Sequence, residues 1–396
     1  MKDKLAKGAQ GLELSSFQEA FALAMSRGCI NLGPGTCDLV THPAIQEAAR
    51  KAIADGYNSY TACEGIPQLR QTLANRYERL LGAAITPKNV LVTNGATGGF
   101  EAICRCFLEP GDEVVIFEPF YQYHVRQVLE RGAILRYVGL EPPTWKFSPQ
   151  ELEQAITAKT KLLILSNPNN PTGKVFSYEE LRAIAAICRS AGVVVVADEV
   201  YEHIVSRQHP HVPIASLPGM LKHTLTLSSA GKTFCVTGWR VGWLVGPLDV
   251  MPALSIKADD VFICAPAPFQ HAIAACLAFE PDFFESVGER FQRNRERICQ
   301  ALHRAGFSPY SSQGAYYVLA SYEKLGYRND AEAATRLMER AHVVAIPGSA
   351  FYSGGRNSGM LRFCFALEDE LLDEACKRLR NFGQANPEIS ELLSSA

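Results

Sequence analysis

Lys232 lies in a segment whose residue types could bind a phosphate or carry out covalent chemistry, Ser228-Ser-Ala-Gly-Lys-Thr233. The triplet from Gly231 to Thr233 is similar to the end of a nucleotide-binding P-loop, which requires another glycine five residues before Gly231. Thr226 stands at that position, so the sequence argues against a P-loop. A lysine amine can instead bond covalently to a carbonyl carbon when its surroundings lower its pKa.

Three other segments hold residues that could do chemistry. Asp198 follows a run of valines, and a carboxylate buried there needs a partner. Arg362 lies in the apolar run from Met360 to Phe365, where a guanidinium is costly unless it meets an anion. A glycine-rich turn at 94–99 precedes a helix, and the N–H groups of a helix N-terminus bind anions. With Lys232, these residues are candidates for one active site.

The elements that must position these residues alternate between strand and helix. Val193 to Ala197 is β-branched and lacks polar alternation, which is typical of a parallel strand buried on both faces. The alternation predicts a mostly parallel sheet covered by helices, with ligands beyond the carboxyl ends of its strands. The predicted strands are 89–93, 113–117, 162–165, 193–197, 225–227 and 241–245, and the predicted helices are 100–108 and 178–191, the second capped by Gly192.

The pattern changes after about residue 280. Helices are predicted at 285–305 and 330–341, and strands at 315–321, 343–346 and 360–365. We therefore expect an α/β fold in which a large domain at 41–280 contains a mostly parallel sheet sandwiched by helices. A smaller α+β domain is expected to combine residues 1–40 with residues 281–396.

Composition excludes several classes of protein. The chain has 396 residues, 47% of them hydrophobic, and a net charge of −2 without a polybasic block, so neither nucleic acid nor a membrane is an expected partner. The first residues lack the apolar core of a secretory signal, and the apolar runs are too short to span a bilayer. The twelve cysteines include no CxxC pair, which favours reduced thiols and a cytoplasmic location.

Four motifs in this order and spacing carry a resemblance to a known family. They are Asn170-Pro-Thr-Gly173, Asp198-Glu-Val-Tyr201, Ser229-Ala-Gly-Lys232 followed by Arg240, and Leu361-Arg-Phe363. From about Asn31 to Phe382 the chain resembles a class I/II aminotransferase dependent on pyridoxal phosphate, of fold type I in the aspartate aminotransferase superfamily. It is most similar to the branch of kynurenine aminotransferases and cysteine-conjugate β-lyases.

The resemblance implies pyridoxal phosphate as cofactor and a role for each matching residue. Lys232 would form the Schiff base and move the proton, while Asp198 would pair with the pyridine nitrogen. Tyr201 and Asn170 would hydrogen-bond the ring oxygen, and Tyr121 would stack on the ring face. The phosphate would be bound by Gly95, Ala96, Thr97, Ser229 and Arg240. Tyr60 would reach the cofactor phosphate of a neighbouring subunit, which implies a homodimer with shared active sites.

The resemblance also implies a substrate site. Arg362 would pair with the α-carboxylate of an L-amino acid, with Gly35 and Asn170 nearby, and the amino group would pass to a 2-oxo acid. Plausible wall residues suit aromatic or large apolar side chains, namely Phe17, Tyr121 and Ile263. Cys37 stands where relatives usually have proline, which should alter the entry to the pocket. The stretch between Gly246 and Glu280 is shorter than in some kynurenine-active relatives, which argues against kynurenine in particular.

Two alternatives to transamination remain open at this point. A cysteine-S-conjugate β-lyase would use the same residues and differ in its substrate's leaving group. A non-catalytic regulator that binds pyridoxal phosphate is disfavoured by the intact Lys232. No metal is expected, because His203, His209 and His211 lack metal-ligand spacing and are interpreted as surface-loop histidines.

Overall fold

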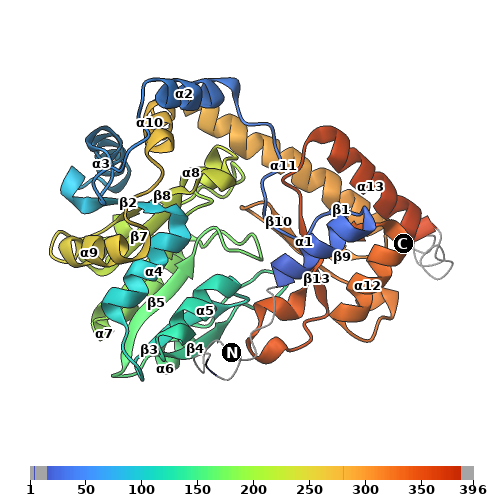
Figure 1. Ribbon diagram of the computed structural model, residues 1–396. Coiled ribbons are helices and arrows are strands. Elements are labelled where there is room, and N and C mark those ends of the chain that lie inside the picture. The colour runs from blue at the N-terminus through green and yellow to red at the C-terminus, as the bar shows by residue number, and fades with distance from the viewer. Residues whose placement is uncertain (1–3, 5–15, 280, 385–396) are drawn as a thin grey trace. The chain divides into compact units, whose positions relative to one another are not determined.

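The computed structural model describes residue 4, residues 16–279 and residues 281–384 (Figure 1). The chain divides into two compact units. The large unit comprises Cys37–Gln292 and Ser312–Ala315, and the small unit comprises the described residues of Met1–Thr36, Arg293–Ser311 and Tyr316–Ala396. The chain thus passes between units after Thr36 and after Gln292, whereas the sequence analysis placed these boundaries after residues 40 and 280.

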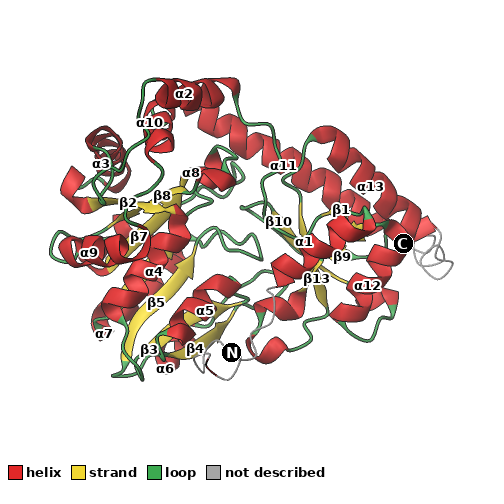
Figure 2. Ribbon diagram, in the orientation of Figure 1, coloured by secondary structure: helices red, strands yellow, loops and turns green. Residues whose placement is uncertain are grey.

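A seven-stranded sheet forms the centre of the large unit, in the order β2-β8-β7-β6-β5-β3-β4. Its strands are β2 Val90–Asn94, β3 Glu113–Glu118, β4 Ile134–Gly139, β5 Thr160–Ser166, β6 Val194–Asp198, β7 Thr224–Ser229 and β8 Val241–Val245. Neighbouring strands are parallel except at β8, which is antiparallel to both β2 and β7. The expected α/β fold with a mostly parallel sheet flanked by helices is confirmed (Figure 2).

The antiparallel strand β8 follows from the length of its connection. Only residues 230–240 separate the end of β7 from the start of β8. A crossover between adjacent parallel strands needs about a dozen residues or more, usually including a helix. The chain instead reverses through Arg240, whose φ of 55° lies in the left-handed region.

Helices cover both faces of this sheet. Along β8, Val241 and Trp243 point into one core cluster, whereas Leu244 points into the other. The first cluster is completed by α3 Pro67–Leu81 and α10 Ala267–Cys276, and the second by α4 Gly95–Phe107, α5 Gln122–Glu130 and α9 Met251–Phe262. The other helices of the large unit are α2 Pro43–Ala54, α6 Pro149–Ala155, α7 Tyr178–Ala191 and α8 Ala230–Thr233.

Local signals explain where two of these helices begin. Helix α7 starts behind Ser177, which forms a capping box with Glu180, and ends at Gly192 in the left-handed conformation, so its predicted bounds are confirmed. Helix α4 starts at Gly95, whereas the sequence analysis placed a turn as far as Gly99. The glycines allow close packing there, because a Cβ on Gly99 would lie 2.7 Å from Leu227 of β7.

The small unit is built around a four-stranded sheet in the order β12-β13-β10-β9. Its central strands are antiparallel, with Leu319 opposite Arg362. The strands of this unit are β1 Ile30–Asn31, β9 Ser308–Pro309, β10 Tyr317–Ser321, β11 Val343–Val344, β12 Ile346–Pro347 and β13 Met360–Cys364. Its helices are α1 Ser16–Arg27, α12 Asp330–Ala341 and α13 Asp369–Gln384, while α11 Pro281–Arg304 contributes residues to both units.

Cys37 and Cys235 form a disulfide within the large unit, so the expectation of reduced thiols is wrong for this pair. Their Cα atoms are 5.3 Å apart, a distance that a disulfide spans. They are separated by 198 positions, so no local pattern could have predicted the pairing. The other ten cysteines are free, and burial raises the pKa of Cys188 and Cys276 to about 12, which makes these thiols unreactive.

No helix among the described residues is both long and apolar enough to cross a lipid bilayer.

Candidate active site

The candidate catalytic residues of the large unit lie where β6 and β7 end. Asp198 is the last residue of β6, and Lys232 lies on the short helix α8 that directly follows β7. The Nζ of Lys232 is 5.7 Å from the centre of the Tyr201 ring. Asp198 and Lys232, which their positions after predicted strands assigned to one site, and Tyr201, which only the resemblance added, therefore gather at one edge of one sheet.

Asp198 has a partner that the sequence analysis missed. Its Oδ2 lies 3.3 Å from Nε2 of His124, and its Oδ1 accepts a hydrogen bond from the N–H of Val200 at 3.3 Å. The side chains of Asp198 and His124 are 9% and 6% exposed. His124 lies one helical turn after Tyr121, and its ring packs edge-on against the Tyr121 ring at 5.2 Å. The i, i+3 spacing was visible in the sequence, but the contact with Asp198 was not.

An anion cradle is formed by Arg240 and the first residues of α4. A Cβ on Gly95 would lie 2.4 Å from Nη2 of Arg240, and a Cβ on Gly242 would lie 2.6 Å from the backbone nitrogen of Ala96. Only glycine fits these two positions, which lets a guanidinium and a helix N-terminus approach the same point. A phosphate group fits this donor set, because it can accept from both. Arg240 is exposed and donates to the carbonyl of Thr237 at 3.0 Å.

Ser229 lies beside the same cradle. It is the N-cap of α8, where its Oγ accepts from the N–H of Gly231 at 3.1 Å and donates to the carbonyl of Val241 at 3.2 Å. Thr97 lies one turn into α4, and its carbonyl accepts from the Gln127 side chain. Ser229 thus comes from the end of β7 and Thr97 from the helix after β2, two strands that lie on either side of β8.

Three further predicted cofactor residues lie on other segments of the chain than the anion cradle. Asn170 is buried, and its backbone N–H donates to Oγ of Ser166 at the end of β5. Tyr121 is half-buried at the start of α5, with its ring stacked near that of Tyr123 at 5.3 Å. Tyr60 is 81% exposed, so no residue in the described part of its own chain buries this side chain.

The predicted carboxylate-binding residue Arg362 is completely buried in the small unit. Its guanidinium carbon lies 4.1 Å from the centre of the Tyr317 ring and 4.8 Å from that of Phe351. Nη2 donates to the carbonyl of Gly33 at 2.5 Å. The aromatic faces hold the guanidinium in place and favour its charge.

Gly35 lies in the same unit beside two tyrosines that the sequence analysis did not consider. Its carbonyl accepts a hydrogen bond from the Tyr316 hydroxyl at 2.9 Å. A Cβ on Gly35 would lie 1.7 Å from the Tyr317 hydroxyl oxygen, so only glycine fits. Gly35 and Arg362 thus share Tyr317 as a neighbour. Because Gly35 and Arg362 are 327 residues apart in the chain, the sequence gave no signal of this shared neighbour.

The structure corrects the interpretation of the histidines. His209 is exposed, as expected, but the side chain of His211 is only 5% exposed. His203 is half-buried, with Nε2 2.7 Å from the Arg76 guanidinium. Among the described residues, no group of three or more potential metal ligands is close enough to hold an ion.

Of the proposed wall residues, Ile263 is 51% exposed at the end of α9. The side chain of Phe17 lies outside the described part of the structure.

A parallel sheet with a lysine, a paired aspartate and an anion cradle at its carboxyl edge defines the class of enzymes that use pyridoxal phosphate in fold type I. Comparison with known proteins identifies the family. The chain belongs to the aminotransferase class I and II family, whose model matches residues 27–379. It is a pyridoxal-phosphate-dependent aminotransferase, so the predicted family, cofactor and type of enzyme are confirmed.

Known relatives match nearly the whole chain. The probable N-succinyldiaminopimelate aminotransferase DapC of Mycobacterium tuberculosis is 38% identical, over 92% of this chain and 94% of that protein. Human kynurenine–oxoglutarate transaminase 1 is 33% identical, over 96% of this chain and 99% of that protein. The solved structure of N-succinyldiaminopimelate aminotransferase from Mycobacterium tuberculosis has a TM-score of 0.92 at 36% identity, covering 96% of this chain and 100% of that chain.

Proposed function

We propose that Lys232 is the catalytic lysine of the transaminase and that Asp198 and Tyr201 act with it. The observation that carries this proposal is the approach of Lys232 to the Tyr201 ring, next to Asp198 at the same sheet edge.

Each residue has a task that its chemistry supports. Pyridoxal phosphate, when bound, supplies an electron sink for the negative charge left on the substrate α-carbon. Asp198 would hold its ring nitrogen, and Tyr201 and Asn170 would hydrogen-bond its ring oxygen, with Tyr121 against the ring face. The phosphate would be bound by Arg240, Ser229 and the N–H groups at Gly95, Ala96 and Thr97.

The free amine of Lys232 would remove the proton from the substrate α-carbon and return it on the cofactor side. Arg362 would bind the substrate carboxylate as a rigid fork of donors. Gly35 and Asn170 are the other proposed substrate-binding residues. Fixing both ends of the substrate sets the direction of the bond that breaks, which lowers the entropic part of the barrier.

We propose an aromatic or large apolar L-amino acid as the amino donor and a 2-oxo acid as acceptor. The relatives are named for different compounds, kynurenine and N-succinyldiaminopimelate, so relationship alone does not select one. Aromatic neighbours of two proposed site residues support the choice, Tyr123 beside Tyr121 and Phe351 beside Arg362.

A panel of amino acids tests the substrate proposal. We expect kcat/KM for phenylalanine, tyrosine, leucine or methionine to exceed that for aspartate by about tenfold or more, because a pocket of apolar walls rejects a carboxylate. Each is assayed with pyruvate, 2-oxoglutarate and phenylpyruvate by chromatography of the amino acid formed. A preference for aspartate would contradict the proposal, and release of pyruvate and ammonia from a cysteine conjugate without oxo acid would indicate the β-lyase.

We further propose a homodimer in which Tyr60 completes the partner's site. Tyr60 is 81% exposed, and other apolar side chains of the large unit are also exposed, namely Val40 at 68%, Ile256 at 63% and Ile263 at 51%.

Hybrid dimers test whether sites are shared. A Tyr60→Phe chain paired with a Lys232→Ala chain should have one intact site, because the intact lysine and tyrosine then meet in the same site. We expect the two-tag-purified hybrid to show about half the wild-type kcat per dimer, with wild-type cofactor affinity at that site. If the losses of activity from the two substitutions are simply additive in the hybrid, Tyr60 belongs to the active site of its own chain.

We also propose a cytoplasmic location. Ten of the twelve cysteines are free thiols, which supports it because cysteines stay reduced in the cytosol, and the pair Cys37–Cys235 is the exception.

A further inference from the structure

Three carboxylates lie within five consecutive residues that begin at the last residue of strand β6, Asp198-Glu-Val-Tyr-Glu202. Asp198 and Glu202 are each 7% exposed, and Glu199 is completely buried. Tyr201, between the acids, is a proposed cofactor ligand. Carboxylates this close repel one another, and a buried charge is costly unless a partner of opposite charge accompanies it.

Each of the three carboxylates has its own nitrogen partner. The pairs are Asp198 with His124 at 3.3 Å, Glu199 with His211 at 3.3 Å and Glu202 with Arg76 at 3.0 Å. The three partners come from different parts of the chain, helix α5, the loop after the turn and helix α3. The turn therefore depends on tertiary contacts for its charge balance.

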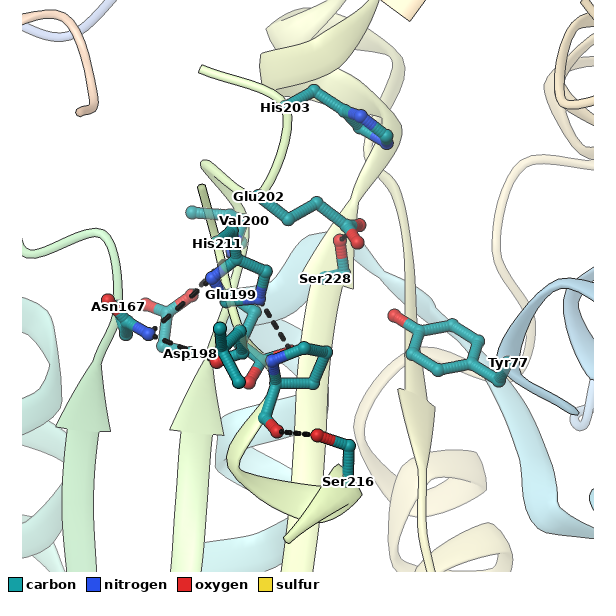
Figure 3. A network of polar contacts seen from close by, with 12 residues as sticks. Tyr77, Asn167, Asp198, Glu199, Val200, Glu202, His203, His211, Ser216 and Ser228 are labelled. Atoms are coloured by element: carbon teal, nitrogen blue, oxygen red, sulfur yellow. Dashed lines mark hydrogen bonds and ion pairs between the residues drawn. The ribbon is translucent and has the colours of Figure 1, made fainter. Parts of the chain in front are cut away.

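The pair of Glu199 and His211 lies next to Asp198, as Figure 3 shows. Asn167 connects the two: its backbone N–H donates to the Asp198 carbonyl at 2.9 Å, and its Nδ2 lies 3.5 Å from Nδ1 of His211. The side chains of His211 and Glu199 are 5% and 1% exposed. Solvent therefore screens this pair very little.

The surroundings of His211 favour its charged form. Burial alone would lower its pKa, but the adjacent Glu199 carboxylate, together with Glu202, outweighs burial and raises the pKa above its usual value near 6.5. The charge is therefore fully present below the ordinary pKa near 6.5 and is lost as pH rises through the raised pKa. Other charged or titratable groups around the turn include Glu202, Arg76, His203, His124 and Tyr77.

Glu202 is held in its charged form on the other side of the turn. Burial would raise its pKa, but Arg76, His203 and His211 lower it, and the Ser228 hydroxyl donates to it at 2.7 Å, so that its pKa falls to about 2. Ser228 precedes the proposed phosphate ligand Ser229. The charge of Glu202 is therefore constant through the pH range in which His211 titrates.

We propose that His211 is a positioning residue for the cofactor: it compensates Glu199, so that Asp198, which His124 contacts, keeps its place for the cofactor ring nitrogen. This inference rests on the proposed role of Asp198. Without the His211 charge, Glu199 either repels Asp198 from the adjacent position or takes up a proton and loses its contact. Both outcomes displace the turn that also carries Tyr201.

The variant His211→Gln tests this directly. Glutamine keeps a donor near the imidazole position but carries no charge. We expect the Kd of pyridoxal phosphate for the apoprotein to rise about tenfold or more, because a buried carboxylate is left without its cation. We also expect the pH midpoint of the cofactor's visible band to move. A wild-type Kd together with an unchanged midpoint would overturn the proposal.

Arg136→Gln is the matched control. Arg136 is the partner of the buried Glu113, 2.7 Å away, at the first residue of β3. The control therefore removes the cation of another buried carboxylate. Glu113 lies at the amino end of a parallel strand, whereas the candidate site lies at the carboxyl ends. Its cofactor Kd should stay within about twofold of wild type, since this pair is remote from the turn.

A double variant separates charge compensation from a purely structural role. His211→Gln with Glu199→Gln leaves no unpaired charge, so it should fold even where the single variant does not, and it should recover a Kd within about threefold of wild type. A folded double variant that binds cofactor as weakly as the single one would overturn the proposal.

Asp198→Asn distinguishes failure of this inference from failure of the proposed function. In that background His211→Gln should change the Kd by less than about twofold, because its effect passes through Asp198. If Asp198→Asn alone leaves the wild-type Kd unchanged, the proposed cofactor role of Asp198 is wrong. If Asp198→Asn raises the Kd and His211→Gln raises it further in that background, the role of Asp198 stands and this inference is wrong.

Discussion

Replacement of Lys232 by alanine is expected to abolish turnover while leaving the fold intact. Lys232 is half-buried on α8 between the small residues Gly231 and Thr233, and its Nζ lies over the Tyr201 ring. Its truncation introduces no larger side chain, so it should leave the fold intact. Loss of a positioned acid–base group alone costs about 10²–10⁴-fold in rate. The covalent link to the cofactor is lost as well, so we expect a larger decrease in kcat.

The covalent link can be measured independently of turnover. Wild-type protein should be yellow, and borohydride should fix the cofactor to the peptide that contains Lys232, as mass spectrometry would show. Lys232→Ala should still bind pyridoxal phosphate through the Arg240 cradle but yield no fixed peptide. The exposed Lys257, paired with Asp260 on α9, provides a control variant, Lys257→Ala, which should behave as wild type. A fixed protein adduct in Lys232→Ala identical to that of wild type would disprove the assignment.

Replacement of Arg362 by alanine is expected to lower kcat/KM for every amino acid by about 30- to 5,000-fold. Truncation of one member of a buried, hydrogen-bonded charge pair costs about 2–5 kcal/mol, and 1.36 kcal/mol corresponds to a factor of ten. All α-amino acids share the carboxylate that Arg362 would bind, so the loss should not depend on the side chain. A loss confined to one amino acid would place Arg362 at the side-chain end of the substrate.

Stability must be separated from binding in this variant. Arg362 fills a fully buried space between Tyr317 and Phe351, so alanine leaves a cavity and should lower the Tm. Arg356 is an exposed arginine of the same unit that lies over the Tyr352 ring at 4.5 Å, and Arg356→Ala should keep wild-type kcat/KM. Cofactor affinity measured by absorbance should be unchanged in Arg362→Ala, because its proposed contact is with substrate alone.

The sequence predicted the elements whose signals are local. The valine run defined β6, and Ser177, Glu180 and Gly192 defined α7 to the residue, because caps and β-branched runs act over a few neighbouring positions. The motif order around Lys232 predicted the family, the cofactor and the type of reaction, all of which were confirmed.

The tertiary structure decided which side chains meet. Asp198 with His124, Glu199 with His211 and Cys37 with Cys235 are pairs brought together by strand order and loop path. The valine run and the acidic turn were visible in the sequence. The nitrogen partners that offset the cost of burying the acidic side chains were not. Local propensities depend on neighbours in the chain, whereas a buried charge depends on whatever residue packs against it, and only the folded chain determines that residue.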